Sequence, residues 1–184
     1  MKKRQQQTLI FVVILLVMLL VIGIILLLQT EKFSYYHNAQ YGFGMNYPQN
    51  WKVIENSQGT AVIFMSPKEN ELDAFQENVN IVVQDLSRKP MGLNEYTSLA
   101  ITQLIAVFKH NIEMIESKPI YWANMPAHKL VYIGKGNDGS RTKLVHVWAV
   151  QGTTAYQLTF ATPEAQYDKY SGSVNTMINS FRLK

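Results

Sequence analysis

The sequence predicts an α+β domain, in which helices pack on an antiparallel β-sheet, preceded by one N-terminal transmembrane helix. Residues 9–28 form an apolar run without a charged side chain. From residue 41 to residue 161, short segments of alternating or β-branched residues are separated by turn residues, a pattern typical of strands. Two other segments repeat apolar residues every three or four positions, as amphipathic helices do. Strands joined by short turns pair antiparallel, and such helices must bury their apolar faces against the sheet.

The apolar run has the length of a membrane span. Twenty helical residues extend about 30 Å, the thickness of the hydrocarbon core of a bilayer. A cleavable signal peptide is the alternative, but its apolar region is usually about 7–15 residues and ends in small residues. Here Gln29-Thr30-Glu31-Lys32 follows the run, and the chain has no cysteine for a lipid anchor. We therefore expect an uncleaved anchor that contacts the lipid bilayer.

The charges beside the run predict its orientation. Lys2, Lys3 and Arg4 precede it, whereas Lys32 follows it beside Glu31. Because positive flanks stay in the cytoplasm, the C-terminal domain is expected outside, in the periplasm or at the cell exterior. The expected order is a cytoplasmic N-terminus at residues 1–8, the span at 9–28, a tether at 29–40 and the folded domain at 41–184.

Charge and composition exclude several classes of function. The net charge is +4, from 17 basic and 13 acidic residues, and residues 1–32 hold four of the basic and one of the acidic residues. The remaining 13 basic and 12 acidic residues give the domain no phosphate-binding field, so no nucleic-acid partner is expected. Without cysteine there is no disulfide, no thiolate metal site and no cysteine nucleophile.

The strands and helices of the domain follow from the same patterns. Strands are expected at residues 41–47, 51–53, 61–66, 79–86, 113–122, 127–134, 143–150 and 153–161. Gln151-Gly152 indicates a tight hairpin between the last two strands. One helix is expected at residues 93–110, and a second begins with Thr162 as its cap and Pro163 at its first position. The face of this second helix carries Tyr167, Tyr170, Val174, Met177, Ile178 and Phe181.

Several motifs, taken in order along the chain, resemble those of PsbP-like domains. These are Gly42-Phe43-x-x-x-Tyr47-Pro48-x-x-Trp51, residues 75–83, Leu93-x-Glu95-Tyr96, Pro126-Ala127 and Ser180-Phe181-Arg182. The resemblance covers about residues 40–184 and implies an antiparallel sheet of about six strands between helices, an α/β/α sandwich. Proteins of this fold, among them an extrinsic subunit of photosystem II, share protein binding and no common reaction. The membrane anchor departs from that subunit, so the resemblance does not carry a photosystem role.

Candidate catalytic and metal-binding groups are few. The four histidines occur in no tight ligand spacing. His128 and His146 lie on successive strands and could face each other, but a one-residue change of register would separate them. Two histidines also fall short of the ligands that zinc needs. We expect no metal, no cofactor and no catalytic residue, and we expect the three tryptophans, Trp51, Trp122 and Trp148, in the core.

An acidic loop at residues 68–78 is the candidate partner-binding segment. Its candidate residues are Glu69, Glu71, Asp73, Phe75 and Glu77. The spacing of an EF-hand calcium loop is absent, so the carboxylates are expected in solvent. The resemblance implies a different role for Phe75, Glu77 and Asn78, which would then anchor the loop to the sheet.

The expected function is that of a non-enzymatic, membrane-anchored binding or assembly module that engages a membrane-bound or envelope protein. The alternative is a small-ligand-binding or sensor domain with a pocket between a helix and the sheet. An exposed apolar patch would favour the first reading. An apolar pocket into which polar groups converge would favour the second, and paired titratable groups in a cleft would favour an enzyme.

Overall fold

The computed structural model describes residues 14–22 and 31–184, and the chain divides into two compact units at residues 1–32 and 33–184. In the first unit, residues 14–22 are helical. No helix among the described residues is long and apolar enough to cross a membrane. The predicted span at 9–28 reaches beyond the described residues on both sides, and Lys2, Lys3 and Arg4 lie outside them. The anchor therefore stays a prediction.

The second unit contains two antiparallel sheets where the resemblance implied a single sheet of about six strands. The larger sheet has seven strands in the order β3-β4-β5-β9-β8-β7-β6. Their bounds are β3 (Lys52–Glu55), β4 (Val62–Met65), β5 (Asn78–Asp85), β9 (Thr154–Pro163), β8 (Arg141–Gln151), β7 (Met125–Lys135) and β6 (Ile112–Trp122). All seven lie close to strands that the sequence patterns predict, and the hairpin between β8 and β9 turns at Gly152, whose φ is +59°.

The smaller sheet brings the two ends of the unit together. Its central strand β2 (Phe43–Pro48) pairs with β1 (Phe33–Asn38) on one side and with β10 (Arg182–Leu183) on the other. Residues 33–38 therefore form a strand, although the sequence analysis placed them in the tether. Their side chains alternate, since Tyr36 and Asn38 are buried whereas Tyr35 and His37 are exposed. This half-buried alternation spans only six residues and directly follows the expected membrane span, where aromatic residues also occur at the lipid headgroups.

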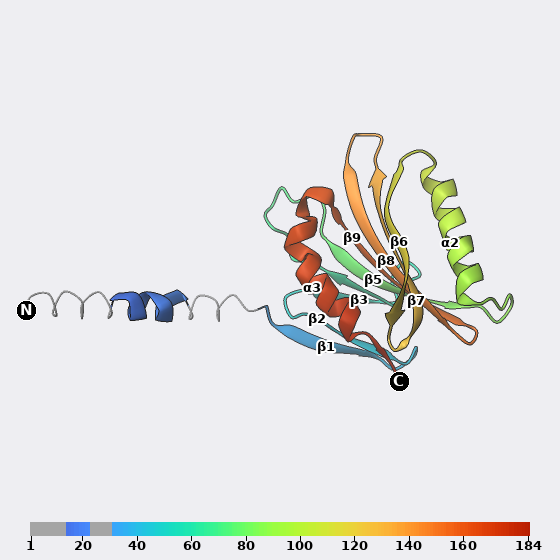
Figure 1. Cartoon of the computed structure of the whole chain (residues 1–184), viewed down its shortest axis with the longest axis horizontal. Helices are drawn as coiled ribbons and strands as arrows, with labels where there is room; N and C mark the ends of the chain where they lie inside the picture. Colours follow the sequence, from blue (N-terminus) through green and yellow to red (C-terminus); the bar gives the residue numbers. More distant parts are fainter. Residues whose placement is uncertain (1–13, 23–30) are drawn as a thin grey trace, which may run out of the picture. The chain divides into compact units, whose positions relative to one another are not determined.

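The larger sheet is covered on both faces (Figure 1). Helix α3 (Tyr167–Ser180) and the smaller sheet lie on one face, and helix α2 (Leu93–Phe108) lies on the other. Because successive strand residues point to opposite faces, each strand divides its side chains between the two layers. In β8, Val145 and Val147 face α3, whereas Leu144 and Trp148 face α2.

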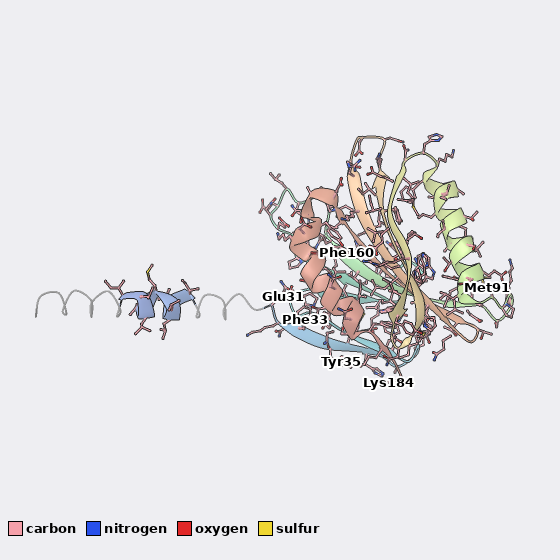
Figure 2. All side chains as sticks on the ribbon, viewed as in Figure 1. Glu31, Phe33, Tyr35, Met91, Phe160 and Lys184 are labelled. Carbon is pink, nitrogen blue, oxygen red and sulfur yellow. The ribbon has the colours of Figure 1, made fainter. Side chains whose placement is uncertain are left out.

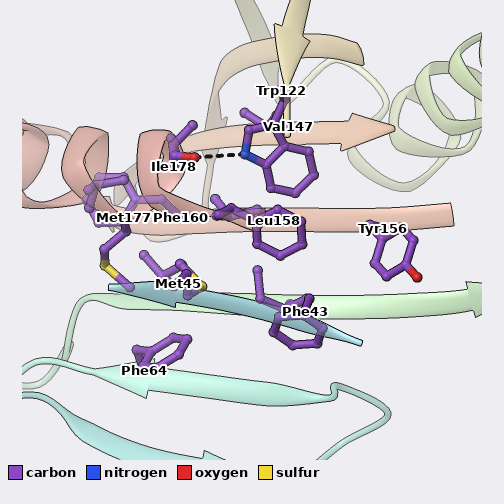
Figure 3. Close-up of a cluster of buried hydrophobic side chains, with 14 of the residues drawn as sticks. Phe43, Met45, Phe64, Trp122, Val147, Tyr156, Leu158, Phe160, Met177 and Ile178 are labelled. Carbon is purple, nitrogen blue, oxygen red and sulfur yellow. Dashed lines mark hydrogen bonds between the residues drawn. The ribbon is translucent and has the colours of Figure 1, made fainter. Parts of the chain in front are cut away.

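The core on the α3 side is the larger of the two (Figure 3). It joins β2, the sheet and α3 through side chains that include Phe43, Met45, Phe64, Leu158, Phe160 and Met177. Phe181 stacks on Trp122, with ring centroids 4.2 Å apart, and on Phe43 at 5.4 Å. The indole Nε1 of Trp122 donates a 2.9 Å hydrogen bond to the carbonyl oxygen of Ile178 at the end of α3 (Figure 3).

The last helix begins later than its expected cap. Strand β9 runs through Pro163, a 3₁₀ turn covers Glu164–Gln166, and α3 starts at Tyr167 without a side-chain cap. Thr162 is buried and pairs with Lys143 of β8. Its hydroxyl therefore lies in the sheet, and the cap-like Thr162-Pro163 sequence ends a strand. Of the expected helical face, Val174, Met177 and Ile178 are buried in α3. Tyr167 and Tyr170 are half-buried, and Phe181 is buried just beyond the end of the helix.

Trp51 provides a test of the α3-side core. Its side chain is 5% exposed, and its ring meets the ring of Tyr170 in α3 at 6.1 Å. We predict that Trp51→Ala lowers the free energy of unfolding by about 3–5 kcal/mol, because it leaves a large cavity. Denaturant unfolding of residues 33–184 measures this change. Tyr121, which is 80% exposed, provides the control, and Tyr121→Ala should change stability by less than about 0.5 kcal/mol. A loss below about 1 kcal/mol for Trp51→Ala would contradict the packing.

Candidate functional site

The acidic loop at residues 68–78 is fastened to the rest of the domain. Glu69 Oε1 accepts hydrogen bonds from Lys169 Nζ at 2.5 Å and from Tyr170 Oη at 2.9 Å, both in α3. These bonds, that from Lys169 first, hold the pKa of Glu69 below its ordinary value. Glu77 is 2% exposed and accepts a 2.9 Å bond from Ser66 Oγ. Two of the predicted partner-binding carboxylates thus have partners within the domain.

The other candidates in this loop have different surroundings. Asp73 accepts hydrogen bonds from the backbone N–H groups of Glu69 and Phe75, which lower the pKa of its carboxyl group. Phe75 is half-buried and Glu71 is exposed. Leu72 is 93% exposed at the tip. The loop therefore offers Glu71 and Leu72 to a partner, and its proposed partner-binding role stays a prediction.

A cavity of about 310 Å³ lies between α2 and the sheet. We call it the α2 cavity. It exists because α2 packs loosely: of its sixteen residues only Tyr96 is buried. Eight apolar residues line it, namely Leu86, Met91, Leu99, Ala100, Leu104, Val107, Leu130 and Trp148. Met91 comes just before the first turn of α2 (Figure 2). Leu99 and Val107 are 37% and 76% exposed, so the rim of the cavity is also apolar.

Polar side chains from three strands converge on the same space. Gln84 of β5, His146 of β8 and Gln157 of β9 line the α2 cavity together with Tyr96 and Gln103 of α2. These three strands are neighbours in the sheet, and the register places all three side chains on its α2 face. A mostly apolar lining with a few converging polar groups is the usual composition of a small-molecule pocket.

His146 is held between two neutral partners. Gln157 Nε2 lies 2.8 Å from Nδ1 of His146, and Tyr132 Oη lies 3.3 Å from its Nε2. With the amide N–H as donor, Nδ1 accepts and the imidazole proton lies on Nε2, toward Tyr132. Burial lowers the pKa of His146 to about 4 and raises the pKa of Tyr132 to about 12. Both groups are therefore uncharged at neutral pH.

Two hydrogen bonds attach α2 to the sheet beside the cavity. Trp148 Nε1 donates to Thr97 Oγ1 at 2.8 Å, and Tyr96 Oη donates to Gln84 Oε1 at 3.1 Å. Both pairs are neutral and span the helix–sheet gap. They position the first half of α2. The apolar wall of the cavity is formed by Leu99, Ala100, Leu104 and Val107 of the same helix.

The sequence left open whether His128 and His146 share a face, and the register shows that they do. His128 pairs with Trp148, and His146 pairs with Leu130. His128 stacks on the Trp148 ring at 5.2 Å, and the His146 ring meets that ring edge-on at 6.4 Å. Trp148 thus contacts both histidines. Among the described residues, no three His, Cys, Asp or Glu side chains gather as a metal site.

A serine also lies beside His128. Ser117 Oγ is 2.9 Å from His128 Nε2, and burial lowers the pKa of that histidine. A hydroxyl next to a neutral imidazole is the first part of a nucleophile–base pair. In the described part of the chain, however, no carboxylate is hydrogen-bonded to His128 to orient it. The two-residue turn at Ala123-Asn124 sets the register that pairs His128 with Pro119 and leaves Ser117 diagonal to it, so sequence spacing did not reveal this pair.

Acid should destabilise the domain through His146. Its pKa of about 4 lies below its ordinary value of 6.5, so the unfolded chain binds more protons between these pH values. Stability is then present above pH 6.5 and is lost as the pH falls toward 4. We predict that the free energy of unfolding falls by about 2 kcal/mol between pH 7 and pH 5 for this reason.

Denaturant unfolding of His146→Gln at the two pH values measures this contribution. The variant should lose most of the acid-induced change, whereas the exposed His110 provides a control, since His110→Gln should keep it. An unchanged pH dependence in His146→Gln would show that the imidazole is solvated in the folded state.

Comparisons with known proteins address the family and the fold. Residues 31–183 match the PsbP family. A search of curated protein sequences found no match. Among solved structures, the chain is similar to cyanobacterial PsbP (CyanoP) from Synechocystis sp. PCC 6803, with a TM-score of 0.61 and 14% identity over 84% of this chain and 94% of that chain.

Two other solved structures have a similar fold. LpqN of Mycobacterium tuberculosis, a protein involved in cell envelope biogenesis, has a TM-score of 0.62 and 10% identity over 85% of this chain and 92% of its own. The Ran-binding protein Mog1p of Saccharomyces cerevisiae has a TM-score of 0.56 and 9% identity, over 84% and 96%. At such identities these likenesses show the fold alone. The sequence match covers most of the chain and agrees with that fold, and it shows that this chain belongs to the PsbP family.

Proposed function

We propose that residues 33–184 form a non-enzymatic binding domain that holds a small ligand in the α2 cavity. The observation that carries the proposal is the cavity itself, about 310 Å³ with eight apolar residues around converging polar groups. This volume lies at the lower end of the range for small-molecule pockets, about 300–1,000 Å³. Of the two functions that the sequence suggested, the geometry favours the ligand-binding one.

The chemistry of the cavity supports binding over catalysis. His146 is neutral and engaged with Gln157 and Tyr132, so it is poorly placed to accept a proton. The Ser117–His128 pair lies near the cavity, but among the described residues no carboxylate hydrogen-bonds to His128 to orient its imidazole. A nucleophile–base pair usually has such a third group. We therefore propose that the domain is not an enzyme.

Ligand binding can be tested by filling the cavity. Ala100 lines the α2 cavity, and a phenyl group at this position would occupy it. We predict that the uncharged fluorescent probe N-phenyl-1-naphthylamine binds residues 33–184 and that Ala100→Phe weakens this binding at least about tenfold, a change of 1.4 kcal/mol. Titration of probe fluorescence gives both dissociation constants.

The matched control is Ala106→Phe. Ala106 is exposed on the same helix and does not line the cavity, so its probe binding should remain unchanged. A single cooperative unfolding transition in each variant establishes that it is folded. Equal probe binding by folded Ala100→Phe and wild-type protein would place the probe elsewhere and contradict the proposal.

A protein partner is the second candidate function. Apolar side chains near the end of α2 and the start of β6 are exposed, namely Ile105 (47%), Met114 (41%) and Ile115 (51%). Met114 pairs with Tyr132, whose ring contacts Phe108 of α2, so these segments adjoin. Exposed apolar residues from adjoining elements favour a protein contact. Mog1p, of similar fold, is a Ran-binding protein, which adds analogy alone.

Crosslinking in intact cells tests this second candidate. The full-length chain should trap one discrete protein, and Ile115→Ser together with Met114→Ser should reduce the yield. Trapping of the same protein by a variant that changes only Glu71 and Leu72 would favour this patch over the loop at residues 68–78. If only the variant of Glu71 and Leu72 stops trapping the protein, the contact is made by the loop at residues 68–78.

We further propose that residues 9–28 anchor the chain in a bilayer, with the N-terminus in the cytoplasm and residues 33–184 outside. The uncharged run and its flank Lys2, Lys3 and Arg4 support this orientation. Only residues 29–32 separate the proposed span from β1, so the domain would stay close to the membrane. Confinement to a membrane raises the effective concentration of partners in the same membrane.

A reporter fusion tests the orientation. We predict that alkaline phosphatase fused after Lys184 is active, because that enzyme works only outside the cytoplasm. Replacement of Lys2, Lys3 and Arg4 by Gln should lower this activity, since it removes the positive flank. An inactive phosphatase combined with a fluorescent cytoplasmic reporter at the same position would reverse the orientation.

A further inference from the structure

We propose that the ligand of the α2 cavity is an uncharged amphiphile, with an apolar body and one polar end that both donates and accepts hydrogen bonds, as a carboxamide does. This inference rests on the proposed function and names the chemical class of its ligand. It follows from the charge of the cavity, from the polar groups that it leaves available, and from its size.

The lining of the α2 cavity carries no charged side chain among the described residues, since it contains no Asp, Glu, Lys or Arg. The one ionisable base, His146, is neutral and bonded on both ring nitrogens. A charged ligand would lose its water there without gaining an ion pair, which is costly in an apolar site. The cavity therefore selects against carboxylates and ammonium groups.

Two glutamine side chains of the lining each keep one polar atom available. Gln84 uses Oε1 to accept from Tyr96, and Gln157 uses Nε2 toward His146. Gln84 is exposed and Gln157 is half-buried, and no described residue hydrogen-bonds to Gln84 Nε2 or to Gln157 Oε1, so both atoms are open to water or to a ligand. One amide donor and one amide acceptor thus remain at the same end of the cavity, on β5 and the adjacent β9. A carboxamide, which carries both functions, matches this pair.

The size of the α2 cavity suits a short chain. Its volume of about 310 Å³ lies at the lower end of the range for small-molecule pockets, about 300–1,000 Å³. An eight-carbon chain with one polar end is a ligand of suitable size for such a site. Its body would lie along Leu104, Val107 and Leu130, and its end would meet the two glutamines. The exposed apolar rim at Leu99 and Val107 gives such a chain a route of entry from α2.

Photolabelling of the full-length chain in lipid nanodiscs tests this class. The probes are octanamide, octanoate and octylamine, each with the same mid-chain diazirine, and the labelled peptides are mapped by mass spectrometry. The relevant label lies in peptides from α2 or from β8 and β9 and is removed by excess unlabelled octanamide. Label in residues 9–28 reports uptake by the bilayer and provides the reference for each probe.

We expect octanamide to label the cavity peptides at least about tenfold more than octanoate or octylamine, relative to that reference. Ala100→Phe should lose this label, and Ala106→Phe should keep it. Gln157→Leu should reduce the preference for octanamide to about threefold or less, whereas Gln151→Leu, an exposed glutamine in the β8–β9 hairpin, should not change it.

Each other outcome has a distinct meaning. Equal cavity labelling by the ionic probes would overturn the ligand class and leave the proposed binding function in place. An absence of competed label from all three probes would overturn both. A crosslinked dimer in place of probe adducts would show that a second copy of the chain fills the cavity, and this result also overturns the proposal.

Discussion

Phe181 lies between the rings of Trp122 and Phe43, and this stack joins three segments that are far apart in the sequence. Trp122 ends β6, Phe43 begins β2, and Phe181 follows α3 directly. The hydrogen bond from Trp122 Nε1 to the Ile178 carbonyl oxygen satisfies the buried N–H donor of the indole ring. The stack therefore fixes the end of α3 and the smaller sheet on one face of the larger sheet at the same point.

That constraint explains why the two faces of the larger sheet differ. On the α3 side, the helix, the smaller sheet and the aromatic stack leave little space, and Phe43, Phe64, Phe160 and Phe181 are all buried. On the α2 side, one helix alone covers a sheet of seven strands, and it buries only Tyr96 of its own residues. Close packing on one face fixes the strands, so incomplete cover on the other face produces a cavity and not a collapse of the sheet.

The sequence predicted those helices and strands whose residue pattern depends on neighbouring positions alone. Segments of alternating or β-branched residues predicted the seven strands of the larger sheet, and the helical period predicted α2 and the buried face of α3. Thr162 and Pro163 do not cap the last helix, because both residues pair with β8 and extend β9. Strand β1 was missed because six alternating residues beside an expected membrane span fit two interpretations. The cavity was foreseen only as a pocket between a helix and the sheet. Its polar residues come from β5, β8 and β9, and only the register between these strands brings Gln84, His146 and Gln157 together.

Neutral hydrogen bonds connect Gln157, His146 and Tyr132 at the α2 cavity, and their neutrality has a physical reason that is independent of the ligand. A charged side chain at the position of His146 would need a partner of opposite sign on the same face, and the described lining provides none. An apolar side chain in place of His146 would leave Tyr132 Oη without the hydrogen bond that it now makes. The neutral imidazole satisfies both the Tyr132 hydroxyl and the Gln157 amide while it adds no charge. The backbone hydrogen bonds of the sheet hold these three side chains in place. Among the described residues, only Thr97 and Tyr96 attach α2 to the sheet by side-chain hydrogen bonds. A ligand would therefore mainly change the free energy of the packing of α2 on the sheet. Ligand binding would then suppress local opening of α2 and raise the free energy of unfolding of the whole domain by mass action.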